Sequence, residues 1–216
     1  MILRLFLLTL ATGLLAACGG DGDSASSSSS SSSSAPYRAG THYERLATPI
    51  AGVADNEVVE VFSYACPACA QFQPEIDAWK RERGNAVILR YEPAEFHPAW
   101  QPHSRAFHAM RRIGALGRGH RAMFEGLYRS GQQPAQTLDQ IADLLAAAGI
   151  DREAFMAAAT SPEVDAAMEA SRNYLKLAGA ASTPTLVVAG RYRIERNQPD
   201  GIKPTAVADW LIANKP

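Results

Sequence analysis

The chain has 216 residues, of which 47% are hydrophobic and 20% charged, enough for one domain with a buried core and some appendages. The formal net charge at pH 7 is −1, so charge gives no indication of a nucleic-acid partner. Five histidines and three cysteines are too few and too scattered to predict a metal cluster.

Residues 1–17 have the pattern of an export signal. Arg4 supplies a short basic region, and Leu5–Leu15 is an apolar stretch too short for a comfortable membrane span. The stretch leads into L-A-A-C ending at Cys18, which resembles a bacterial lipobox, whose cysteine is lipidated in the mature protein. The alternative is an ordinary cleaved signal that happens to precede a cysteine. Either way we expect export to an oxidising compartment, where disulfides persist.

Residues 18–36 are predicted to be a tether that follows the lipidated cysteine. Ser26–Ser34 is an unbroken serine run with nothing to bury, so we expect it to stay flexible. A flexible chain of this length has a root-mean-square reach of about 23 Å. Low-complexity drift without a selected length is the alternative. Gly19 follows Cys18, and by the sorting rule of enteric bacteria this favours the outer membrane over the inner.

The segment Val58–Cys69 reads V-V-E-V-F-S-Y-A-C-P-A-C, a short apolar strand, a turn, and two cysteines that open a helix. Pro67 suits the first turn of a helix, where its missing N–H has no intrahelical partner to lose. Cys66 is therefore placed at the helix N-terminus, where unpaired N–H groups and the helix dipole favour a thiolate. Cys69 lies one turn further on, within reach of a small disulfide ring.

The number of cysteines narrows the interpretation. If Cys18 carries lipid, only Cys66 and Cys69 remain, and they form either a redox pair or one structural disulfide. So short a ring constrains little of the unfolded chain, because the entropic gain of a disulfide grows with loop length. This favours a redox pair.

The sequence predicts the following elements around this motif. A βαβ unit with parallel strands comprises a strand at Val58–Ser63, a helix at Cys66–Gly84 kinked at Pro74, and a strand at Ala86–Tyr91. An edge strand at Tyr43–Ala47 precedes it. A hairpin at Thr183–Val188 and Arg191–Ile194 and a helix at Pro204–Asn214 close the chain.

The segment between these parts has almost no strand signal. It is predicted to contain five helices, with Thr137, Asp151 and Ser161 as N-cap residues and Gly117 as one boundary. The predicted helices are Pro102–Leu116, Gly119–Ser130, Leu138–Ala148, Asp151–Thr160 and Ser161–Leu177.

This ordered set of motifs resembles the DsbA branch of the thioredoxin fold. The resemblance covers Tyr37–Pro216 and rests on Y-x-x-G-x-x-Y at Tyr37–Tyr43, E-V-F-S-Y-A-C-P-A-C at Glu60–Cys69, and A-G-R-Y-R-I at Ala189–Ile194. It implies an α/β fold, a thioredoxin fold with an inserted all-helical domain. The thioredoxin-like core would comprise residues 37–97 and 178–216, and the helical insertion residues 98–177.

The resemblance also implies roles for individual residues. Cys66 would be the solvent-exposed attacking thiol, and Cys69 its buried resolving partner. Pro184 matches the family's cis-proline, which would leave the Thr183 backbone free to pair with an extended substrate. From the residues alone, a trans proline at the start of an edge strand is an equal alternative.

Glu60 lies among apolar neighbours on a strand, an unusual place for a carboxylate. The resemblance implies a buried acid near Cys69 that assists proton transfer, and a solvent-facing glutamate is the alternative. The family's lysine partner is replaced by Arg90. An arginine does not release its proton at these pH values, so Arg90 is expected to pair with Glu60 at most.

Ala68 is a second departure from the family pattern, because the best-known members have histidine between the proline and the second cysteine. Alanine cannot stabilise the Cys66 thiolate as a histidine can. We therefore expect Cys66 to remain acidic, but less so than in members with C-P-H-C, and the oxidising power to be weaker.

The predicted function is a periplasmic thiol:disulfide oxidoreductase that donates its Cys66–Cys69 disulfide to reduced exported proteins and needs no other cofactor. A quinone-linked membrane protein of the DsbB type would reoxidise it. A reductase or isomerase on the same fold is the main alternative, although no added dimerisation domain is visible. Zinc or copper bound by the cysteines with His97 or His103, and a non-catalytic binding module, are further alternatives.

Overall fold

The computed structural model describes residues 35–128 and 135–216. The predicted signal segment, Cys18 and the serine run of the tether lie outside these residues. Within the described part of the chain, no helix combines the length and the apolar character needed to cross a membrane.

A mixed β-sheet forms the centre of the described unit. Its strand order is β1 (Glu44–Arg45), β5 (Tyr192–Glu195), β4 (Thr185–Val188), β2 (Glu57–Phe62), β3 (Ile88–Pro93). Strands β2 and β3 are parallel, as predicted for the βαβ unit, and the other neighbours are antiparallel. Every residue of β2 is buried, so its apolar run reflects coverage on both faces.

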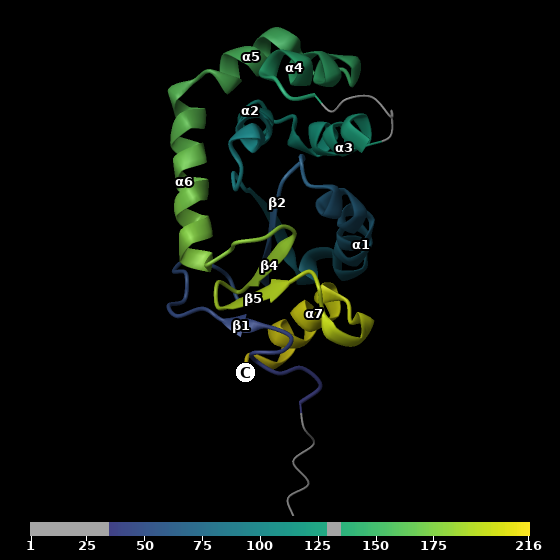
Figure 1. Cartoon of the computed structure of the whole chain (residues 1–216), viewed down its shortest axis with the longest axis vertical. Helices are drawn as coiled ribbons and strands as arrows, with labels where there is room; N and C mark the ends of the chain where they lie inside the picture. The colour runs from purple at the N-terminus through teal and green to yellow at the C-terminus, as the bar shows by residue number, and fades with distance from the viewer. Residues whose placement is uncertain (1–34, 129–134) are drawn as a thin grey trace, which may run out of the picture. The chain divides into compact units, whose positions relative to one another are not determined.

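The helices divide into two groups by their place in the chain. Helix α1 (Pro67–Arg83) joins β2 to β3, and α7 (Pro204–Asn214) follows β5. Between β3 and β4 the chain forms five helices in the described residues, which Figure 1 shows stacked at one end of the sheet and, in the case of α6, along its side. They are α2 (Gln101–Arg112), α3 (Leu116–Tyr128), α4 (Leu138–Ala147), α5 (Arg152–Ala159) and α6 (Pro162–Ala178).

The predicted N-caps are confirmed. Thr137 forms a capping box with Gln140, while Asp151 and Ser161 accept hydrogen bonds from the backbone N–H groups of Ala154 and Val164. Each such cap stabilises its helix by about 1 kcal/mol.

Two boundaries differ from the prediction. Gly117 lies inside α3 and is not a boundary; the break falls at Gly114, whose φ is +68°, a conformation that glycine adopts without steric cost. Strand β3 begins at Ile88, two residues later than predicted, because Gly84–Ala86 continues α1 as a short 3₁₀ turn. Helix α1 itself runs through Pro74.

The two faces of β2 pack against different helices. Val58 contributes to a cluster with Phe72 and Ile76 of α1, whereas Val59 and Val61 pack with apolar residues of α6. Figure 1 shows these helices on opposite sides of the strand. Successive β2 side chains therefore enter separate environments, and burial of each valine among them stabilises the fold by about 1.5–3 kcal/mol.

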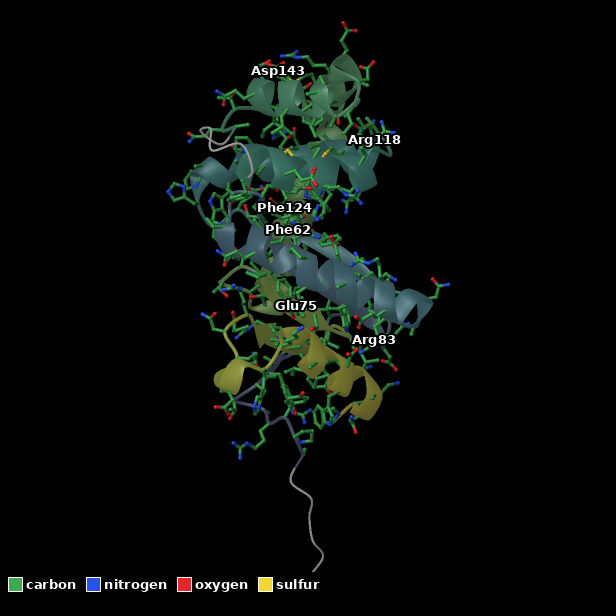
Figure 2. All side chains as sticks on the ribbon, turned by 90° about the vertical axis from the view of Figure 1, so that its right-hand side faces the viewer. Phe62, Glu75, Arg83, Arg118, Phe124 and Asp143 are labelled. Atoms are coloured by element: carbon green, nitrogen blue, oxygen red, sulfur yellow. The ribbon has the colours of Figure 1, made fainter. Side chains whose placement is uncertain are left out.

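A third cluster connects the end of β2 to the insertion. Phe62 packs with Phe107 of α2 and Phe124 of α3, and the same cluster includes both cysteines. In Figure 2, Phe62 and Phe124 lie next to each other between α1 and the helices above it. The cysteine pair is therefore built at the junction between the sheet and the insertion.

Candidate active site: two unlike thiols at the start of α1

The turn from β2 into α1 places Cys66 at the helix N-cap. Its backbone is extended, with φ −95° and ψ 112°, and Pro67 occupies the first turn. Ser63 shapes the turn, because its carbonyl accepts the Cys66 N–H at 3.1 Å and its Oγ accepts the Ala65 N–H at 3.1 Å. The predicted position of the motif is confirmed, with the strand–turn–helix order intact.

The two cysteines are free thiols with different surroundings. Cys69 is completely buried, and Cys66 keeps 7% of its surface exposed. The prediction of a solvent-exposed Cys66 is therefore wrong, because the residue is largely buried. Only a small part of Cys66 is accessible to an attacking thiolate.

The pKa values of the two thiols are shifted in opposite directions. A hydrogen bond from Cys69 is the largest cause that lowers the pKa of Cys66 to about 5; bonds from the Thr183 side chain and the backbone of Ala68 and Cys69 add to it, against the effect of burial. Burial raises the pKa of Cys69 well above its usual range, and the nearby Cys66 adds to this. At neutral pH the pair is thus one thiolate and one thiol.

The loop before β4 lies against the Cys66 sulfur. The Thr183–Pro184 peptide bond is cis, as the family resemblance implied, and the Thr183 carbonyl oxygen lies 3.5 Å from Cys66 Sγ. Glu195 of β5 fastens this loop, because its carboxylate accepts hydrogen bonds from the hydroxyls of Ser182 and Thr185. The fold therefore brings the predicted site residues Thr183 and Pro184 next to the Cys66 thiol.

Glu60 is fully buried on the face of β2 that looks toward α1, and the solvent-facing alternative is excluded. Neither carboxylate oxygen has a hydrogen-bond partner among the described residues. Burial, followed by the charges of Asp77 and Cys66, raises the pKa of Glu60 well above its usual value. Glu60 in turn raises the pKa of Cys69. Burial therefore favours the protonated form of this carboxyl, which also interacts electrostatically with the buried Cys69 thiol.

The predicted pairing of Arg90 with Glu60 is wrong. Arg90 lies opposite Val59 in the β2–β3 register, so its side chain points to the other face of the sheet. There it forms ion pairs with Glu57 at 3.3 Å and Glu92 at 3.4 Å. The residue opposite Glu60 is Tyr91, which means that an uncharged phenol takes the place expected for a cation.

Sequence reasoning missed the aromatic residues around the site. His120 of α3 is buried among four aromatic rings, with centroids 5.3 Å from Phe62, 5.3 Å from Tyr64, 4.4 Å from Tyr91 and 5.2 Å from Phe124. These residues come from β2, the turn, β3 and α3. No local pattern connects them, so only the tertiary structure shows the group.

The histidines named as possible metal ligands have other contacts. His97 is exposed and caps a 3₁₀ turn by accepting the Ala99 N–H at 3.1 Å, and His103 Nε2 lies 2.9 Å from the Ala135 carbonyl oxygen. In residues 35–128 and 135–216, no three His, Cys, Asp or Glu side chains are grouped so that they could hold a metal ion.

Comparison with known proteins shows which family the chain belongs to. The family model described as Thioredoxin matches residues 51–205. The thiol:disulfide interchange protein DsbA of Azotobacter vinelandii is 35% identical over 181 residues, covering 82% of this chain and 84% of that protein. The chain belongs to the DsbA family.

Solved structures agree with this family assignment. The DsbA oxidoreductase of Xylella fastidiosa is 31% identical with a TM-score of 0.74, and the match covers 83% of this chain and 97% of that one. Pseudomonas aeruginosa DsbA is 30% identical with a TM-score of 0.73, and the match covers 83% of this chain and 94% of that one. The predicted fold class, a thioredoxin fold with an inserted all-helical domain, is confirmed. This DsbA-family chain differs from the expected pattern at Ala68 and in the partner of Glu60.

Proposed function

We propose that this chain is a protein-disulfide oxidoreductase that donates the Cys66–Cys69 disulfide to exported proteins. The observation that carries the proposal is the contrast between the two thiols, an acidic Cys66 at the start of α1 and a buried Cys69 that holds its proton. The DsbA-family relatives, named thiol:disulfide interchange proteins, support the same activity.

The reaction starts from the oxidised pair. A substrate thiolate attacks Cys66 Sγ, the Cys66–Cys69 bond breaks, and the Cys69 sulfur leaves with the electron pair. A second thiolate of the same substrate then attacks the substrate sulfur of the mixed disulfide and expels Cys66. The substrate gains a disulfide and the protein gains two thiols. The low pKa of Cys66 makes it a good leaving group in the second step.

Glu60 is proposed to supply the proton of the first step. The departing Cys69 sulfur is completely buried and is unstable as a thiolate, so it needs a proton at once. A protonated carboxyl with no other hydrogen-bond partner among the described residues is suited to donate one. In the reverse direction, when the disulfide is formed again, the Glu60 carboxylate would accept the Cys69 proton.

Thr183 and Pro184 are proposed to orient the substrate. The Thr183 side chain stabilises the Cys66 thiolate, and its backbone lies against the sulfur. An extended substrate segment that pairs with this backbone would bring its own cysteine into line with Cys66.

The proposed location is the bacterial periplasm, with Cys18 lipidated and the outer membrane favoured over the inner. The family assignment supports the periplasm, whereas the lipobox-like sequence and Gly19 support the anchor and the outer membrane. A DsbB-type membrane protein would accept the electrons. Fractionation of cells that produce wild type or Cys18→Ser is the test. We expect only the wild type in the membrane fraction, and an identical distribution of the two would overturn the anchor.

The deciding experiment for the activity is the reduction potential of the Cys66–Cys69 pair, equilibrated against glutathione buffers. We expect a value of about −120 mV, the potential of DsbA itself, lowered somewhat because Ala68 stabilises the Cys66 thiolate less than a histidine would. A value near about −270 mV, typical of thioredoxin, would mean that the protein donates electrons, and the oxidase assignment would fall. Cys66→Ser serves as the inactive control.

A further inference from the structure

The turn that carries Cys66 is attached to helix α3 at two points. Tyr64 is almost completely buried, and its hydroxyl lies 2.8 Å from His120 Nδ1. The Tyr64 backbone carbonyl accepts a hydrogen bond from the Tyr128 hydroxyl at 2.9 Å. Side chain and backbone of one residue, two positions before the reactive cysteine, are thus both held by the helical insertion.

The direction of this hydrogen-bond chain is fixed by its outer end. Gln73 Nε2 lies 3.0 Å from the carboxylate of Asp77, which only accepts hydrogen bonds, so the Gln73 amide oxygen must be the atom that faces His120 Nε2 at 3.2 Å. His120 Nε2–H therefore donates. Burial lowers the pKa of His120 to about 4, so the ring is neutral and Nδ1 must accept from the Tyr64 hydroxyl.

His120 consequently connects the segments on both sides of the cysteine pair. Tyr64 precedes Cys66 in the turn, and Gln73 follows Cys69 on α1. The four aromatic rings around His120 leave it little freedom to turn. The imidazole is buried, its tautomer is defined, and none of the proton-transfer or exchange steps above uses it.

We propose that His120 and Tyr128 are positioning residues for the active-site thiol, and that they set its reactivity by fastening the Tyr64 turn to α3. The thiolate of Cys66 depends on hydrogen bonds from Cys69, Thr183 and the first backbone N–H groups of α1. These bonds form only when Sγ is held at the helix start. A turn released from α3 would hold Sγ less accurately, and the thiolate would lose stability. The inference rests on the proposed function for its catalytic meaning.

The test uses variants that remove one hydrogen bond each. Tyr128→Phe removes the bond to the Tyr64 carbonyl and keeps the ring. His120→Gln places its amide group near the position of Nε2, so the hydrogen bond from the Tyr64 hydroxyl is lost. His120→Asn places its amide group near the position of Nδ1, so the hydrogen bond from the Tyr64 hydroxyl is kept. The measurements are the thiolate absorbance of Cys66 against pH and the equilibrium constant with glutathione.

We expect Tyr128→Phe and His120→Gln each to weaken thiolate stability by about threefold to tenfold, since each loses one hydrogen bond that holds the turn. The pKa of Cys66 should rise and the equilibrium constant with glutathione should shift toward the disulfide by the same factor. His120→Asn should stay within about twofold of wild type, because the bond to Tyr64 is retained.

Two controls make the result decisive. Tyr174→Phe removes a buried hydroxyl that has no hydrogen-bond partner among the described residues, also within the insertion, and should leave both measurements unchanged. Ala68→His shows that the assay responds, because a cation beside Cys66 should lower its pKa. If the pKa of Cys66 in Tyr128→Phe equals that of the wild type, the inference is overturned, whatever pKa is measured in His120→Gln. A wild-type Cys66 that does not titrate as an acidic thiol would instead overturn the proposed function.

Discussion

The two faces of the β2–β3 pair hold buried carboxylates in opposite ways. On the face toward α1, Glu60 has no hydrogen-bond partner among the described residues, and the residue opposite is the phenol Tyr91. On the face toward α6, Glu57 and Glu92 share the guanidinium of Arg90. The same strands therefore carry one carboxyl whose burial favours the protonated form and two that are paired with a charge.

The face toward α6 is also tied to the insertion by further polar contacts. The Ser171 hydroxyl of α6 donates to Glu92 and lies 2.9 Å from His108 Nε2 of α2. Burial, followed by the charges of Arg111, Arg105 and Arg172, lowers the pKa of His108 to about 3, so its ring is neutral. These groups satisfy one another, which is typical of a structural network. The comparison teaches that the carboxyl without a partner is the one available for chemistry.

The largest expected difference between the two faces is in the rate of dithiol oxidation. Glu60→Gln removes the proposed proton donor for Cys69 and should slow oxidation of a dithiol peptide in a single turnover by about tenfold to a hundredfold at neutral pH. The matched control is Glu57→Gln, the same change three residues earlier on the same strand, which should leave the rate within about twofold. Stopped-flow fluorescence measures both. Equal rates in the two variants would remove the distinction between the faces.

The second expected effect is on the pH dependence of stability. The pKa of Glu60 is raised in the folded state above its usual value of 4.5, so between these two values the folded state binds more protons than the unfolded state. The wild type therefore loses stability as pH rises through this window, by about 1.4 kcal/mol per pH unit relative to Glu60→Gln, and the difference levels off above the folded pKa.

Urea unfolding of the reduced proteins from pH 4 to pH 8 measures this difference. The part of the Cys66 thiolate's contribution that does not depend on Glu60 is common to both proteins and cancels in the comparison. A difference in the free energy of unfolding that does not change with pH would show that Glu60 ionises normally.

The smallest expected effect lies on the other face. Arg90→Met leaves Glu57 and Glu92 buried without their cation and should lower the free energy of unfolding by about 1–2 kcal/mol. The effect is moderate because the Arg90 side chain is 47% exposed, so water screens the pairs, and its contact with Glu57 lacks hydrogen-bond geometry. The Cys66 titration should not move. A shifted Cys66 pKa would mean that the two faces are coupled through β2.

The features predicted well from sequence are those with local causes. N-cap residues satisfy N–H groups within three positions, and Thr137, Asp151 and Ser161 all form the expected caps. The strand–turn–helix around the cysteines is equally local. Gly117 shows the limit of such reasoning. Two glycines occur close together, and no local pattern distinguishes Gly114, which takes the positive φ, from Gly117, which stays helical.

The features missed depend on contacts between distant segments. The face to which Arg90 points follows from its register opposite Val59, and a shift of one residue in a strand reverses the face of every side chain. His120 had no sequence signal as a site residue, because Tyr64 and Gln73 meet it only after the insertion has folded onto the junction with the sheet. Burial of Glu60, by contrast, is implied by the family resemblance, and its apolar neighbours on the strand mark the position as unusual.

The distribution of thiols has a consequence for how the protein is made. The chain has three cysteines, and the domain from residue 35 onward contains only the Cys66–Cys69 pair. Its core is held by apolar clusters and capped helices, with no disulfide that staples distant segments. A newly made copy can therefore reach its native structure before any oxidant has acted on it. A catalyst of disulfide formation built in this way does not depend on its own product for maturation.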